Sequence, residues 1–206
     1  MRKLIYYKAF NEHNRKPIGS GQDHTAYATK IIPNAVIKLK KPRGYDSLSF
    51  EIYAGDYKRC PHLIAKIIKI TKNYLIIEKL DNKRVKDEVE YMENLIGQHT
   101  KIADMFHYRK TTTSPKHTFD NYDFIYNIEQ TLPYAHQVKE QPDNKELFND
   151  TNNILESLKS LDNKCYLMFK TYVDFIWECK RNYISRDIDS NNIGYDIEGN
   201  LKCLDV

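Results

Sequence analysis

The stretch 185-SRDIDSNNIGYDIEGNLKCLDV-206 holds the pattern that decides how the chain is interpreted. In it, Asp187 precedes Asn192 by five positions, and Asp205 follows Asn192 after thirteen more. Ile197-Glu198-Gly199 predicts the turn of a β-hairpin, which can bring all three polar side chains to one edge. Asp and Asn are also common in loops that bind nothing. Residues far upstream decide between these interpretations.

A lysine stands inside an apolar segment early in the chain. Lys38 lies in AVIKLK, residues 35–40, which has the length and composition of a β-strand. An ammonium group on the inner side of a strand is costly to bury unless something pairs with it. Glu51, thirteen positions later in the predicted helix 48–58, is a natural partner. A solvated lysine and a surface glutamate are the ordinary alternative, so the two count only in combination with the C-terminal pattern.

The spacing of apolar residues changes along the chain from strand-like to helical. Residues 1–81 alternate short strands with turn signals and hold one helix, whose apolar face is expected to include Leu48 and Ile52, with Tyr53 as a further candidate. Residues 82–206 are mainly helical in spacing, and their polar stretch 111–121 is expected to be a mobile loop. The sequence thus predicts an α+β protein with a small antiparallel-sheet lobe followed by a reduced, mainly helical lobe.

The order of these polar residues resembles the protein-kinase-like family, with its HRDxxxxN catalytic loop and its DFG aspartate. Ser185-Arg186-Asp187 stands in the place of HRD, Asn192 completes that motif, and Asp205 stands in the place of the DFG aspartate. The resemblance implies that Asp187 orients the acceptor hydroxyl and takes its proton. It also implies that Asn192 and Asp205 hold magnesium against the phosphates of ATP. Oxygen ligands of this kind suit a hard cation such as magnesium.

The same resemblance extends to the strand-rich part of the chain. Lys38 matches the lysine of the family's VAIK strand, and Glu51 is then implied to orient it toward the phosphates. Gly19-Ser20-Gly21 falls where the family has its glycine-rich loop, with His24 in place of the third glycine. Glu78 to Leu80 fall where the family's hinge pairs with adenine through backbone groups.

By this resemblance the chain is an ATP-dependent phosphotransferase that binds Mg-ATP between its two lobes. The leading expectation is a serine/threonine protein kinase, similar to the small kinases of tailed bacteriophages. A protein substrate or a host protein partner is then expected, in the cytoplasm of the host if the chain is of phage origin. An acceptor could be held by residues 82–163 or by a second subunit, so a homo-oligomer is one expectation.

Departures from the family pattern keep other functions open. Ser185 replaces the family's histidine, and the sequence ends one residue after Asp205, without the family's Phe-Gly and later helices. A pseudokinase that binds a partner without transferring phosphate is therefore an alternative. A small-molecule kinase resembling the aminoglycoside and choline kinases is another.

A calcium loop is a further alternative for the same stretch. Oxygen-bearing residues occupy positions 1, 3, 5 and 12 of an EF-hand-like pattern, namely Asp187, Asp189, Asn191 and Glu198. Position 6 is Asn192 instead of glycine, and no exiting helix is expected after Glu198. These differences disfavour calcium binding.

Composition excludes several other classes of protein. The 32 Lys and Arg residues exceed the 28 Asp and Glu residues by four and are spread along the chain, which gives no support for nucleic-acid binding. The apolar runs are far too short to span a membrane. The cysteines lack metal-ligand spacing and are expected to be reduced thiols in a cytoplasmic protein; they are Cys60, Cys165, Cys179 and Cys203.

Overall fold

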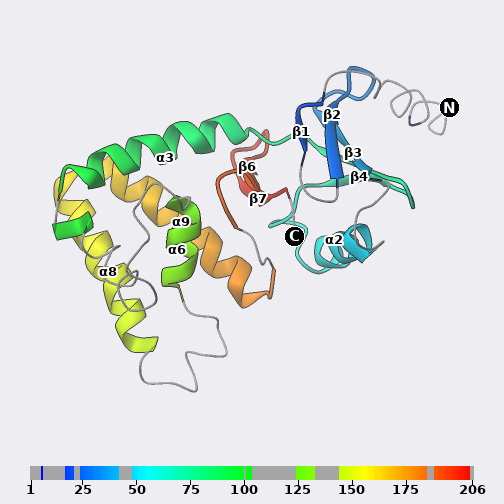
Figure 1. Cartoon of the computed structure of the whole chain (residues 1–206). Coiled ribbons are helices and arrows are strands. Elements are labelled where there is room, and N and C mark those ends of the chain that lie inside the picture. Colours follow the sequence, from blue (N-terminus) through cyan, green and yellow to red (C-terminus); the bar gives the residue numbers. More distant parts are fainter. Residues whose placement is uncertain are drawn as a thin grey trace. The chain divides into compact units, whose positions relative to one another are not determined.

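The computed structural model describes residues 6, 17–20, 24–41, 48–99, 101–103, 124–132, 144–184 and 188–204 (Figure 1). These residues divide into two compact units, each of which is described by itself. The first unit contains the described residues up to Asp81 together with Asp196–Leu204, and the second contains those of Asn82–Tyr195. Asp196–Leu204 therefore differs from expectation, because the sequence assigns this segment to the helical lobe.

The first unit is built on a five-stranded sheet in which all pairs are antiparallel and the order is β1-β2-β3-β5-β4. Its strands are short and rich in isoleucine, as expected for β-structure. They are β1 (Gly19–Ser20), β2 (His24–Ala28), β3 (Ala35–Lys40), β4 (Ile67–Ile70) and β5 (Tyr74–Glu78). Between β2 and β3 the chain turns at Asn34, whose φ of 53° lies in the left-handed region that asparagine tolerates. This confirms the predicted antiparallel sheet.

The two faces of the sheet bury different side chains. Ile37 on β3 and Ile76 on β5 are fully buried in one apolar cluster. Since side chains alternate along a strand, the neighbours of Ile37 point to the other face. There Lys38 lies opposite Leu75 in the register of β3 with β5, and Val36 lies opposite Ile77. The sequence thus places one charged group among buried apolar ones.

Helix α2 (Leu48–Arg59) confirms the predicted helix of this unit but only part of its predicted apolar face. Phe50 and Tyr53, three positions apart, are the buried pair. Ile52 is 51% exposed, and the side chain of Leu48 lies outside the described residues. The aromatic rings decide the orientation because they bury more apolar surface than one isoleucine.

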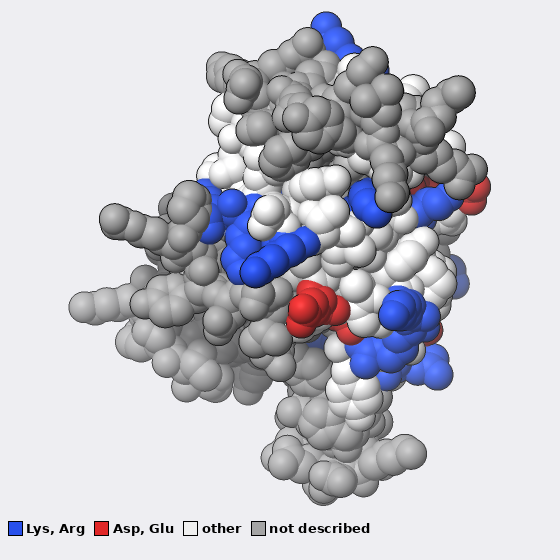
Figure 2. Space-filling view, turned by 90° about the vertical axis from the view of Figure 1, so that its right-hand side faces the viewer, with Lys and Arg blue, Asp and Glu red and all other residues white. Residues whose placement is uncertain are grey.

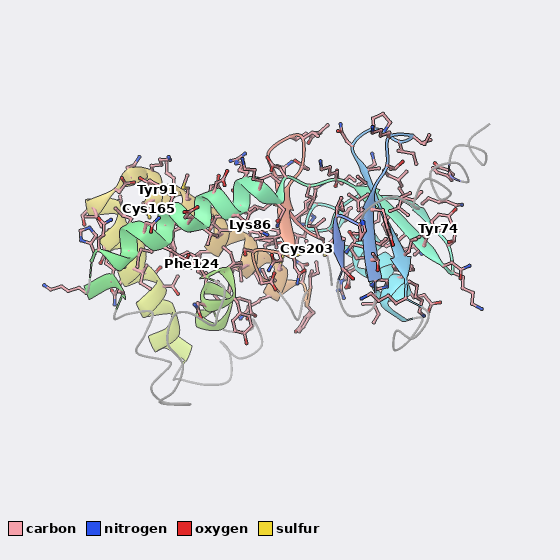
Figure 3. The ribbon with its side chains drawn as sticks, turned by 45° about the horizontal axis from the view of Figure 1, so that its top comes forward. Tyr74, Lys86, Tyr91, Phe124, Cys165 and Cys203 are labelled. Atoms are coloured by element: carbon pink, nitrogen blue, oxygen red, sulfur yellow. The ribbon has the colours of Figure 1, made fainter. Side chains whose placement is uncertain are left out.

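The described part of the second unit is mainly helical (Figure 1). Its elements are α3 (Asn82–Gly97), α6 (Phe124–Thr131), α8 (Asn144–Leu161), α9 (Asn163–Arg181) and the strand β6 (Ile193–Tyr195). Asp162 caps α9 by accepting from the backbone N–H of Cys165 at 2.6 Å, and the hydroxyl of Tyr91 on α3 donates to the same carboxylate at 3.1 Å. Figure 3 shows Tyr91 close to Cys165. The predicted loop 111–121 lies outside the described residues.

The charged surface, the cysteines and the helices can be compared with the expectations drawn from composition. Figure 2 shows acidic as well as basic side chains on the face that it draws. Each of the four cysteines is a buried free thiol, and burial raises the pKa of Cys165 to about 11. Among the described helices, none has the length and apolar character needed to cross a membrane.

Candidate functional site

Lys38 is the first predicted site residue that the structure places. Only 7% of it is exposed, and its Nζ donates to the carbonyl oxygen of Leu204 at 2.6 Å. This bond joins residues 166 positions apart. A buried ammonium group that is hydrogen-bonded costs much less free energy than one that is not. The predicted phosphate-binding lysine therefore meets the backbone of the residue that precedes Asp205, which itself lies outside the described residues.

Backbone bonds hold the segment around Leu204 in the first unit. β7 (Leu201–Cys203) is the strand of this segment, and Cys203 forms a parallel bridge with Ile64. Its N–H donates to the carbonyl of Leu63 at 2.8 Å, and its carbonyl accepts from the N–H of Ala65 at 2.9 Å. The position of Leu204 beside Lys38 is thus set by main-chain hydrogen bonds, which do not depend on the identity of the side chains.

A cluster of three charged residues adds to this anchoring. Lys202 Nζ lies 2.9 Å from Glu78 Oε1 and 3.0 Å from Asp196 Oδ2. Burial would lower the pKa of Lys202, but its bonds to Glu78 and Asp196 outweigh burial and raise it. For Asp196 burial acts in the opposite direction and would raise the pKa. The hydrogen bonds from the N–H of Asn200 and from the ammonium of Lys202 nevertheless hold it at about 2. Lys202 and Asp196 therefore carry opposite charges at neutral pH.

The predicted hinge follows β5 in the same unit. Two of its backbone N–H groups are used within the fold, since Glu78 donates to Lys66 at 3.0 Å and Lys79 donates to Asn34 at 2.7 Å. Leu80 is buried, and its N–H donates to no other described residue. The carboxylate of Glu78 serves the ion cluster instead of a ligand.

The predicted glycine-rich loop begins as the hairpin of β1 and β2. Gly19 pairs with Ala26 and Ser20 pairs with Thr25, while Gly21 lies outside the described residues. A Cβ on Gly19 would lie 4.0 Å from the Cβ of Ala26, which is an ordinary contact. Neighbouring protein atoms therefore do not demand glycine at this position.

The third glycine of the family pattern is His24, which has a packing role. Its ring stacks on Phe50 of α2, with 4.6 Å between the ring centroids and 20° between the ring planes. This contact joins the hairpin to α2.

Glu51 is not brought to Lys38. It is exposed on α2, and no ion pair between Glu51 and Lys38 occurs in the part of the chain that the structure describes. The buried face of α2, set by Phe50 and Tyr53, turns Glu51 toward solvent. The contact of the Lys38 ammonium that the described residues show is the bond to the Leu204 carbonyl.

In the second unit, the predicted catalytic loop is described from Ile188 onward. Asp189 Oδ1 accepts from the N–H groups of Asn191 at 2.7 Å and Asn192 at 3.0 Å, an arrangement that closes a tight turn. Asn192 Nδ2 donates to Asp189 Oδ2 at 3.3 Å. Asn192 also carries an amide oxygen, a ligand type that magnesium accepts. Asp187, the predicted base, lies outside the described residues.

Asn82, at the start of α3, is a functional candidate that the sequence does not reveal. Its Nδ2 donates to the carbonyls of Ser190 at 2.5 Å and Ile193 at 2.8 Å. These carbonyls stand on either side of Asn192. An asparagine that opens a predicted helix looks like an ordinary cap, so only the fold shows this contact.

Glu88 on α3 anchors the strand that follows the loop. Its Oε2 accepts from the hydroxyls of Tyr172 and Tyr195, each at 2.7 Å, and its Oε1 accepts from Arg84 Nε at 2.9 Å. The Arg84 guanidinium lies 3.8 Å from the centroid of the Tyr195 ring. Burial, with the bond to Glu88, raises the pKa of Tyr195 to about 12 and raises that of Tyr172 as well. Both hydroxyls therefore remain donors at neutral pH.

Of the two predicted magnesium ligands, Asn192 belongs to the described residues and Asp205 does not. Among described residues, no group of three or more His, Cys, Asp or Glu side chains could hold a metal ion. The magnesium ligands expected from the sequence, Asn192 and Asp205, stay a prediction, because Asp205 lies outside the described residues. The calcium-loop alternative gains no support, because an EF-hand has an exiting helix where this chain has the strand β7.

Comparison with solved structures found chains that are similar to this one. The structure titled "Structure of the streptomycin-ATP-APH(2")-IIa ternary complex" aligns with a TM-score of 0.31 and 13% sequence identity, over 96% of this chain and 67% of that one. No protein-family model matches the chain. No curated protein matches it either.

Proposed function

We propose that this protein is an ATP-dependent phosphotransferase of the protein-kinase-like type. The observation that carries the proposal is the bond from Lys38 Nζ to the Leu204 carbonyl. This bond joins Lys38, which matches the family's VAIK lysine, to the residue that precedes Asp205, which matches the DFG aspartate. An ordinary surface lysine would be solvated, whereas Lys38 is 7% exposed.

The proposed roles follow from the chemistry of each group. Lys38 contributes a positive charge for the phosphates, and Leu80 contributes a backbone N–H for the base. Asp187 orients the acceptor hydroxyl and takes its proton. Asn192 and Asp205 hold magnesium, which when bound neutralises charge on the transferred phosphoryl group. A serine or threonine hydroxyl of a protein is the first acceptor to test.

Transfer of radiolabel from γ-labelled ATP to the protein itself or to a general protein substrate tests this proposal. We expect labelling that requires magnesium and that is abolished by Asp187→Ala and by Asp205→Ala. Asp174→Ala is the matched control, because Asp174 is an exposed residue of α9 whose ion pair with Lys170 is also exposed. Labelling that persists in both site variants would sink the assignment. Label appearing on an added aminoglycoside or choline instead would change the acceptor class but keep the reaction.

A pseudokinase is the second candidate, and the position of Glu51 favours it. Glu51 is exposed and does not pair with Lys38, whereas the family's active members rely on that pair to orient the lysine. In this case Mg-ATP raises the melting temperature of the protein without any transfer of label. A biological effect that survives Asp187→Ala would support the pseudokinase, and its loss would count against it.

A further inference from the structure

The side-chain amide of Asn82 grips the loop that carries Asn192. An amide nitrogen has two hydrogens, and in Asn82 they serve two acceptors, the carbonyls of Ser190 and Ile193. Ser190 is 8% exposed and Ile193 is fully buried, so water cannot easily replace the amide at either carbonyl. Loss of the amide would leave buried acceptors without this donor.

The contact differs from an ordinary helix cap. A cap satisfies the helix's own N–H groups through a side-chain oxygen, whereas Asn82 donates through its nitrogen to another segment. From the other side, Asp189 binds the N–H groups of Asn191 and Asn192. The backbone N–H of Asn192 is thus held by Asp189 within the loop, and the backbone on either side of Asn192 is held by Asn82 from α3.

We propose that Asn82 is a positioning residue for the metal site, an inference that rests on the proposed function of Asn192. It acts by fixing the backbone on both sides of Asn192, so that the Asn192 amide oxygen is presented in one orientation. Groups that orient a ligand from outside the coordination sphere affect metal affinity by about 10- to 100-fold. Asn82 fits this description because it bonds to the loop's backbone and not to the Asn192 side chain.

Asn82→Asp is the sharpest test, because it keeps the size of the side chain and removes both donors. The carboxylate would face two carbonyl oxygens, so the loop is expected to move away from it. A negative charge in the first turn is favourable for the helix dipole, so α3 itself should not be weakened. Asn94→Asp is the matched control, since Asn94 is exposed on the same helix and the change in charge is identical.

The experiment titrates Mg²⁺ at a fixed concentration of a fluorescent ATP analogue and measures binding, with the melting temperature of the free protein as a second readout. We expect the Mg²⁺ concentration at half-saturation to rise at least tenfold in Asn82→Asp and to stay unchanged in Asn94→Asp. Nucleotide binding without Mg²⁺ should be equal in all three proteins. Asn82→Ser, whose hydroxyl can replace at most one of the two bonds, should give a smaller rise, and it serves as the test if the aspartate variant does not fold.

The outcomes separate this inference from the function on which it rests. Wild-type protein that shows no Mg²⁺-dependent nucleotide binding would overturn the proposed function and the role of Asn82 together. Wild-type binding with an unchanged Mg²⁺ half-saturation in the Asn82 variants would overturn the role of Asn82 alone. A lower melting temperature with unchanged Mg²⁺ dependence would assign Asn82 to stability and also contradict the proposal.

Discussion

Lys38 Nζ and the carbonyl oxygen of Leu204 lie 2.6 Å apart, although 166 positions separate the two residues. The bond depends on two independent features of the first unit. The alternation of β3 puts Lys38 on the same face as Val36, and the bridge of Cys203 with Ile64 brings the next residue, Leu204, to the sheet. The ammonium is therefore held in a fixed place, where its charge can act on a ligand.

Lys38→Met should separate the role of this charge from its role in folding. Methionine fills similar space, and it removes both the bond to Leu204 and the cost of burying a charge. The free energy of unfolding should therefore change by no more than about 1 kcal/mol. Affinity for ATP should fall about tenfold or more, because a charged contact with phosphate is lost, while affinity for adenosine stays the same.

Calorimetric titration with ATP and with adenosine checks this prediction. Lys40→Met is the control, because Lys40 lies on the same strand and is not bonded to Leu204. Equal losses for ATP and adenosine in Lys38→Met would show that the lysine does not contact the phosphates.

Asp196 should make stability depend on pH in a defined acidic window. Its pKa is lowered from 3.8 to about 2, with the bonds from Asn200 and Lys202 outweighing the effect of burial. A carboxyl group whose pKa is lower in the folded state stabilises the fold above its unfolded pKa and loses this effect as the pH falls. We therefore expect about 2 kcal/mol to be present above pH 4 and to disappear between about pH 4 and pH 2.

Urea unfolding of wild type and of Asp196→Asn across this range measures the difference directly. The free-energy gap between the two proteins should shrink as the pH falls from 4 to 2. Asp174→Asn, at an exposed carboxylate, should show no such convergence. A constant gap for Asp196→Asn would mean that the ion cluster does not depend on its charge.

The two tyrosine hydroxyls on Glu88 should be energetically coupled because they share one oxygen. Tyr172→Phe and Tyr195→Phe each remove a hydrogen bond to a charged group, so each should cost about 1.5–3 kcal/mol of unfolding free energy. The double variant leaves Glu88 Oε2 without either hydroxyl, so its cost should differ from the sum by at least 0.5 kcal/mol, in the usual range for shared partners, about 0.5–3 kcal/mol. Tyr166→Phe on the same helix as Tyr172 is the control, with an expected change within about 0.5 kcal/mol.

A double-mutant cycle by chemical denaturation tests this coupling. Strictly additive losses would indicate that each hydroxyl bonds Glu88 independently of the other. Losses no larger than that of Tyr166→Phe would show that the carboxylate does not depend on either hydroxyl.

Much of the sheet could be predicted because its signals are local. The segment AVIKLK and the turn at Asn34 specify β3 through neighbouring residues alone, and α2 is visible from its composition. The buried face of α2 was predicted only in part. Tyr53 is buried as expected, but Ile52 is exposed and Phe50 takes its place, because packing against the rest of the unit decides among them.

The candidate site could be predicted only where spacing along the chain carries the information. The order of Lys38, Asn192 and Asp205 is a sequence property, whereas the exposed position of Glu51 follows from the packing of α2. Asn82 bonds carbonyls more than 100 positions away, and such backbone acceptors leave no trace in residue identity. Glu88 did leave a signal, because it interrupts the apolar positions of α3 and must find partners when buried.

The buried lysine of α9 gives the last prediction. Lys180 Nζ donates to the carbonyls of Glu129 and Leu132, at the C-terminal end of α6, and lies 3.0 Å from Glu129 Oε1. Burial lowers the pKa of Lys180, and the Glu129 carboxylate opposes that shift. Lys180→Met would leave a buried carboxylate without this ammonium, at a cost of about 3–5 kcal/mol of unfolding free energy.

Two further variants make this last prediction specific. Adding Glu129→Gln to Lys180→Met removes the buried charge and should recover part of the loss, although the two carbonyls still lack their donor. Lys170→Met on the same helix breaks an ion pair whose side chains are 46% and 63% exposed, so it should cost less than about 1 kcal/mol. Urea unfolding of the four proteins compares these values. Equal losses for Lys180→Met and Lys170→Met would contradict the prediction, because they would mean that burial adds nothing to the strength of the Lys180 contacts.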